Sequence, residues 1–189
     1  YAQVVLGYSP VQFGLMFAVM TVLTILGSTL AGGPLVSRFG PRPVAIGGLL
    51  LIGLSCLTLT GIHTHGSFTG DILLGMILFG PGLGAGFVAG TIAALAGVPE
   101  RDSGFASGVT TAAFHVGGAL GIAILSTVAI TNAVGPNPVT AMVTGFRSAY
   151  GVGVVFAAVG IVAAVAFLRR PKQTTAAVTP LPERHRDAA

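Results

Sequence analysis

The stretch "GFASGVTTAAFHVGGALGIAI", residues 104–124, decides the fold class of this chain. Its single ionisable residue is His115, and every other position carries glycine, a small hydroxyl residue or an apolar side chain. Such a run is long enough to cross a bilayer, which takes about 20 residues. A helical period gathers the small residues and the histidine on one face, which we expect to point away from lipid. That face comprises Gly104, Gly108, Thr111, His115 and Gly118.

The composition extends this interpretation to the whole chain. Of its 189 residues, 53% are hydrophobic and 7% are charged, and the mean hydropathy is +0.91. Soluble domains carry about 25% charged residues, so lipid must be the solvent for most of this surface. The net charge of +4 comes from basic residues in short clusters between apolar runs, which indicates membrane topology and excludes a nucleic-acid surface. The single cysteine, Cys56, excludes an intrachain disulfide.

Five apolar stretches are each long enough to span a membrane, so the sequence predicts an all-α polytopic membrane protein. We place these spans at about residues 10–35, 43–62, 71–98, 103–131 and 145–168. Ser9 is the expected N-cap of span one and Pro10 its first helical residue. Asp102 and Ser103 are expected to cap span four. The polar residues 171–189 have nothing to bury, and we expect them to form a disordered cytoplasmic tail.

Lysine and arginine fall mainly on one side of the five spans, and the positive-inside rule makes that side cytoplasmic. The residues on that side are Arg38, Arg42, Arg101, Arg169, Arg170 and Lys172. The opposite side carries Arg147 alone, so the C-terminus is expected to be inside. Both cytoplasmic links between spans are short, which predicts that the helices they join are antiparallel neighbours.

The spans differ in the residues they offer to their surroundings. Spans two and five are almost uniformly apolar and are expected to face lipid, whereas spans one, three and four are mixed. Glycines four residues apart let another helix approach closely. Such helix-packing glycines are Gly82, Gly86 and Gly90 in span three and Gly104, Gly108, Gly117 and Gly121 in span four. Pro81 is expected to kink span three near mid-membrane.

The motifs of enzymes and metal sites are absent from the sequence. It contains no G-x-S-x-G, no H-E-x-x-H and no Asp or Glu within a span, so we expect no enzyme and no cofactor. His63 and His65 lie two residues apart without a third ligand, and we expect no metal site.

The loop "GPLVSRFGPRP", residues 33–43, resembles the loop signature of the major facilitator superfamily, G-x-x-x-D-R-x-G-R-R. The matching residues are Gly33, Arg38, Gly40 and Arg42. Ser37 stands where the signature has an acidic residue, and Pro41 stands where it has a basic one. The stretches "VLGYSPVQFGLMF", "DSGFASGVTTAAFHVGGALGIAILSTVA" and "GFRSAYGVGVVF" are similar to the last helices of the fourteen-span drug–proton antiporters of that superfamily.

The resemblance covers residues 1–170 and implies the last five helices of a C-terminal six-helix bundle. We therefore expect Tyr1 to be an internal cut, with an N-terminal bundle preceding it in the intact protein. The resemblance implies a transporter of a bacterial plasma membrane that exports lipophilic compounds in exchange for protons by alternating access. This portion alone is expected to be inactive. Since no carboxylate lies within a span, the main proton carriers are expected elsewhere in the intact protein.

By the same resemblance, spans one, three and four would line a central cavity, and spans two and five would form the outer wall. The substrate-cavity candidates are Gln12, Met16, Met20, Thr24, Phe87, Thr111, Phe114 and His115. The loop motif would brace the cytoplasmic side against the opposite bundle. Because Ser37 lacks the acidic group, we expect that brace to be weaker than in the superfamily pattern.

Several interpretations remain open at this point. His115 either hydrogen-bonds substrate or exchanges protons, or it is a neutral histidine bonded to a neighbouring helix. The arginines of the loop motif either brace the bundles or only set topology. The aromatic and methionine side chains either form an adaptable wall for a ligand or pack the helices. At the level of the whole chain, the alternative to a transporter is a small membrane scaffold or accessory protein.

Overall fold

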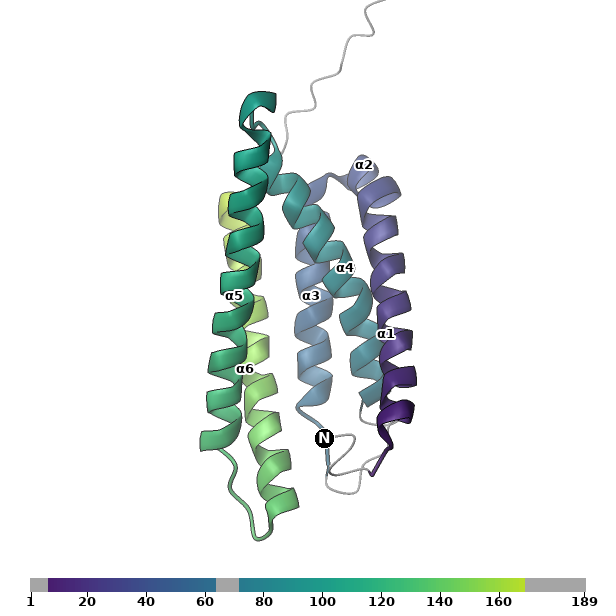
Figure 1. The fold of residues 1–189 in the computed structure, drawn as a ribbon, viewed down its shortest axis with the longest axis vertical. Helices are drawn as coiled ribbons and strands as arrows, with labels where there is room; N and C mark the ends of the chain where they lie inside the picture. Colours follow the sequence, from purple (N-terminus) through teal and green to yellow (C-terminus); the bar gives the residue numbers. More distant parts are fainter. Residues whose placement is uncertain (1–6, 64–71, 169–189) are drawn as a thin grey trace, which may run out of the picture.

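The computed structural model describes residues 7–63 and 72–168, and within these ranges the chain is helical with no strand (Figure 1). The helices are α1 Pro10–Leu30, α2 Val36–Phe39, α3 Pro41–Leu59, α4 Leu73–Leu95, α5 Ser103–Thr131 and α6 Pro138–Phe167. A π-helical segment, Ala31–Leu35, joins α1 to α2, and a 3-10 turn, Glu100–Asp102, precedes α5. Five helical stretches of the described chain are long and apolar enough to cross a membrane. The prediction of an all-α polytopic membrane protein is therefore confirmed.

Some of the sequence predictions fall on residues outside the described ranges. They concern His65, Asp71, Arg169, Arg170, Lys172 and the tail at residues 171–189.

Local sequence signals account for the helix starts. Ser9 accepts a hydrogen bond from the backbone N–H of Gln12, and the Gln12 side chain accepts one from the Ser9 N–H, which forms a complete capping box. At α6, the side chain of Asn137 accepts from the N–H of Thr140 at 2.8 Å. This cap and Pro138 start α6 seven residues before the predicted start at residue 145, so Arg147 lies well inside the helix.

The other span limits shift by a few residues. The first helical stretch continues beyond residue 35 to Phe39, because the π-helical segment accommodates Pro34 and the Val36 N–H bonds to the carbonyl of Ala31. It ends at Gly40, whose φ of 82° disfavours any residue with a side chain. The following helix begins at Pro41 rather than residue 43. α4 is shorter than predicted, and α5 covers the predicted range.

The five long helices form a curved row in the order α1, α4, α3, α6, α5 (Figure 1). The prediction that short links join neighbouring helices is wrong for α1 and α3, because α4 lies between them. α4 and α5, which the second short link joins, do contact each other, but only over a small area. α2 and the start of α5 lie at the top of the view, and the link between α5 and α6 lies at the bottom (Figure 1).

Glycines explain why α4 takes the position between α1 and α3. A Cβ added at Gly84 would collide with the carbonyl oxygen of Thr24 and lie 2.7 Å from the Ser28 nitrogen, both in α1. On the α3 side, a Cβ at Gly82 would lie 2.9 Å from the carbonyl oxygen of Gly48. Backbones that approach this closely gain dispersion energy in a lipid environment, where burial of apolar surface supplies little driving force.

The described chain buries few side chains and exposes many large apolar ones. A small core forms from Ala31, Val44, Ala45 and Ala89. α5 contains no buried residue, although it is the second longest helix. On α3, the exposed leucines Leu50, Leu54 and Leu57 recur at helical spacing and form one stripe, which suits contact with lipid.

Candidate functional site

Four of the predicted cavity residues meet in one hollow between α3, α4 and α5, with a volume of about 510 Å³. They are Phe87, Thr111, Phe114 and His115. The rings of Phe87 and Phe114 lie edge to face with centroids 5.0 Å apart, which joins α4 to α5. The ring of His115 packs against Phe114 at 5.8 Å in a similar geometry.

The walls of this hollow are mainly apolar, with a few polar groups. Thr110 and Thr91 also line it, and each hydroxyl donates to a carbonyl of its own helix at 2.8 Å. These hydroxyl oxygens keep lone pairs that can accept hydrogen bonds. The imidazole of His115 adds a ring nitrogen donor and acceptor. A hollow of this size and character can hold a mostly apolar ligand and orient one polar group on it.

A second hollow of about 410 Å³ lies between α1, α6, the end of α3 and the start of α4. Met20 is the predicted cavity residue that lines it. Sequence reasoning missed the contribution of Phe79 in α4 and of Phe146 and Tyr150 in α6, which line the same hollow only in the folded chain. Helical periodicity within one span gives no signal for such a cluster.

The remaining cavity candidates lie elsewhere. Gln12 is used in the capping box at the start of α1. Thr24 lies half-buried at the contact of α1 with α4, and its hydroxyl donates to the Met20 carbonyl at 2.9 Å. Met16 is half-buried on α1, one turn before Met20. The side chains of Gln12 and Thr24 therefore have structural partners in this arrangement.

The residues of the loop motif have different structural roles. Gly40 supplies the positive φ at the junction of α2 and α3, while Gly33 has open space around it. Arg38 is exposed. Arg42 donates from Nη2 to the carbonyl oxygen of Val165 in α6 at 2.6 Å, so it contacts a helix of its own bundle.

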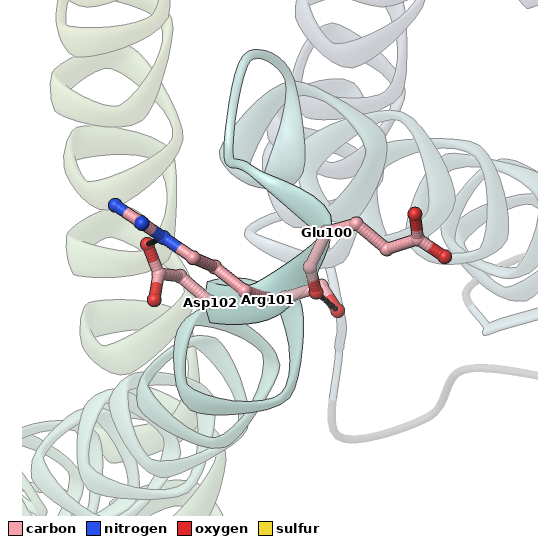
Figure 2. Close-up of polar contacts among 4 residues, drawn as sticks. Glu100, Arg101 and Asp102 are labelled. Atoms are coloured by element: carbon pink, nitrogen blue, oxygen red, sulfur yellow. Dashed lines mark hydrogen bonds and ion pairs between the residues drawn. The ribbon is translucent and has the colours of Figure 1, made fainter.

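The acidic start of α5 differs from the expected cap (Figure 2). Asp102 takes the N-cap position, but its side chain makes no capping hydrogen bond. Its carboxylate pairs instead with Nε of Arg101 at 3.4 Å, while the side chain of Glu100 points the other way (Figure 2). The Ser103 hydroxyl donates to the carbonyl of Glu100 at 2.7 Å. This ion pair is well exposed and contributes little to stability.

The glycines predicted for helix packing separate into two groups. In α4, Gly82 contacts α3 closely, a Cβ added at Gly86 would lie 3.9 Å from Gly48, and Gly90 has open space. In α5, no atom of the described chain lies within 4 Å of a Cβ added at any of the predicted glycines. Those are Gly104, Gly108, Gly117 and Gly121.

The described ranges also hold no group of three His, Cys, Asp or Glu side chains that could bind a metal ion.

A row of apolar helices that encloses mainly apolar hollows defines a multi-pass membrane protein. The chain belongs to the Major Facilitator Superfamily, whose family model matches residues 1–189. This is a family of transporters and not of enzymes.

The curated relatives are named as resistance or transport proteins of bacteria. The chain is 34% identical over 177 residues to the puromycin resistance protein of Streptomyces alboniger, which covers 89% of this chain and 35% of that protein. It is 33% identical over 132 residues to the probable actinorhodin transporter of Streptomyces coelicolor, covering 67% of this chain and 22% of that protein. It is also 34% identical over 125 residues to the tetracenomycin C resistance and export protein of Streptomyces glaucescens, with 66% and 23% covered. The chain thus spans about a third or less of these relatives.

Proposed function

We propose that this chain is part of a secondary transporter that exports drugs or other lipophilic compounds from a bacterial cell. The observation that carries the proposal is the hollow in which Phe87, Phe114 and His115 line an apolar wall beside the open face of α5. The names of its relatives, which include puromycin resistance and tetracenomycin C export, support the same substrate class.

The proposed mechanism is alternating access, in which two bundles rock around a cavity near the middle of the membrane. The lack of contacts on the glycine face of α5 supports a partner bundle outside this chain. We propose that the partner bundle, supplied by the rest of a longer protein, completes the cavity, so that this portion alone does not transport.

Proton exchange is the proposed driving force. None of the described α-helices contains Asp or Glu, and buried carboxylates are the usual proton carriers in transporters. We therefore assign the main proton carriers to the partner bundle, with His115 as a hydrogen-bonding group for substrate. The basic ends near Arg38 and Arg101 are assigned to the cytoplasm, together with the C-terminus.

The direct test is dye export by the full-length gene in a drug-sensitive bacterial host. We expect expression to lower the accumulation of a lipophilic fluorescent dye, and a protonophore to abolish the effect. Residues 1–189 expressed alone serve as the control and are expected to leave accumulation unchanged. Unchanged accumulation with the full-length gene, or export that persists in the protonophore, contradicts the proposal.

A further inference from the structure

Two arginines join α3 to α6 at opposite ends of the pair. Near the start of α3, Arg42 Nη2 donates to the carbonyl oxygen of Val165. Val165 lies three residues before Leu168, the C-cap residue of α6. Near the end of α3, Arg147 Nε donates from α6 to the carbonyl oxygen of Thr60 at 2.7 Å. Each helix thus supplies one guanidinium to the C-terminal end of the other.

Within the described residues, both acceptors lie beside the last local hydrogen bonds of their helix. In α6, the Ala164 carbonyl accepts from the Leu168 N–H, and Val165 is the next residue along. In α3, the carbonyls of Thr58 and Leu59 accept from the two residues after Thr60. Carbonyls at a helix C-terminus lack intrahelical partners and carry partial negative charge, so a guanidinium both bonds them and opposes that charge.

The spacing of the two contacts matches between the helices. Eighteen residues separate Arg42 from Thr60 along α3, and eighteen separate Arg147 from Val165 along α6. At 1.5 Å per residue, each helix covers about 27 Å between the contacts. The hydrocarbon core of a bilayer is about 30 Å thick, so both guanidinium groups can lie at its two boundaries, where a charge costs little.

Small side chains close the seam between the two contacts. A Cβ at Gly153 would lie 3.0 Å from the Cys56 sulfur, and a Cβ at Gly53 would lie 3.1 Å from the Cβ of Ala157. The helices therefore approach closely along the length that the arginines delimit.

We propose that Arg42 and Arg147 form a paired clamp that fixes α3 to α6 at both membrane boundaries, so that the two helices move as one body. The inference does not depend on what the protein transports, because it concerns the geometry of one helix pair. Each arginine acts as a positioning residue and holds only its own end of the pair.

The experiment measures distances between spin labels on the protein in lipid nanodiscs, in a Cys56→Ala background. One label pair reports the end near Arg147, with Leu57→Cys on α3 and Gly151→Cys on α6. The other reports the end near Arg42, with Gly47→Cys and Val162→Cys. The leucine and valine are exposed, and the two glycines have open space around them, so the labels fit.

We expect each substitution to loosen one end only, because the two contacts are separate. Arg147→Gln should roughly double the width of the Leu57–Gly151 distance distribution and leave the other pair unchanged, and Arg42→Gln should do the reverse. The control Arg38→Gln removes one positive charge four residues from Arg42, and it should change neither distribution.

The clamp is disproved if the double variant leaves both distributions unchanged, or if Arg38→Gln widens the same pair as Arg42→Gln. If a glutamine variant loses its helical circular dichroism signal, Arg42→Lys and Arg147→Lys replace it. Each lysine keeps the charge but not the planar fork, and should still widen its own end only. Widening at both ends by one lysine, or at neither end, contradicts the proposal.

Discussion

At the scale of single residues, Gly84 fits its position because α1 leaves no room for a side chain there. A Cβ would meet the Thr24 carbonyl and the Ser28 nitrogen and hydroxyl. Gly90, on the same helix, has open space. We expect Gly84→Ala to lower the free energy of unfolding by about 1–3 kcal/mol, because the helices must separate. Gly90→Ala should change it by less than about 1 kcal/mol.

The measurement is unfolding of the purified protein in detergent micelles, followed by circular dichroism, with both variants compared under the same conditions. Equal stability of the two variants would show that the contact between α1 and α4 is looser than described here.

His115 carries the second prediction at this scale. Its ring packs beside Phe114 in the hollow, where a glutamine can also present a donor and an acceptor. His115→Gln in the full-length protein should therefore keep dye export within roughly twofold of the unsubstituted protein. Transport is measured between pH 5.5 and 8, the range in which histidine changes charge. A pH dependence that the substitution abolishes would assign proton exchange to His115.

The sequence anticipated the residues of the two hollows only in part. Thr111, Phe114 and His115 follow from helical periodicity in one span. Phe79, Phe146 and Tyr150, which line the second hollow, do not, because their proximity depends on how α4 and α6 are placed. The polar groups of Gln12 and Thr24 suggested cavity residues, but a helix start and a helix contact use them.

At the scale of helices, α5 carries glycines at the spacing of a packed helix but has no buried residue. Its predicted packing glycines meet no atom within 4 Å in the described chain. We therefore predict that Gly108→Leu leaves the thermal stability of this chain unchanged and abolishes dye export by the full-length protein, because the added side chain would block the partner bundle that we propose.

Gly47→Leu on α3 is the matched control. Gly47 also has open space, and its spacing places it on the stripe of Leu50, Leu54 and Leu57. This variant should preserve both stability and export. Normal export by Gly108→Leu would remove the argument for a partner on that face of α5 and favour the accessory-protein alternative.

Helix limits followed from the sequence better than helix neighbours did. The caps at Ser9 and Asn137 are local signals, although the second was overlooked and α6 starts earlier than predicted. The order of the row was not predictable in the same way. The order of the helices depends on which face of α4 packs against α1 and which packs against α3. Gly84 allows the close contact with α1, and Gly82 allows the close contact with α3.

At the scale of the whole molecule, composition indicated the solvent, and the apolar stretches indicated the number of spans. With 7% charged residues, the chain has too few groups for a water-facing surface, and five described helices are long and apolar enough to cross a membrane. Composition carries no information about the partner bundle that we propose. The chain spans 35% of its puromycin-resistance relative.

The central claim is that α5 turns its small-residue face to water and that α3 turns its leucine stripe to lipid. The most direct test is labelling of single cysteines in the full-length protein, in opened membrane vesicles, with a membrane-impermeant thiol reagent. Cysteines at Gly108, Thr111 and Gly118 should react, and cysteines at Leu50 and Leu54 should stay unlabelled. Reactive positions on α3 beside an unreactive α5 would contradict the account.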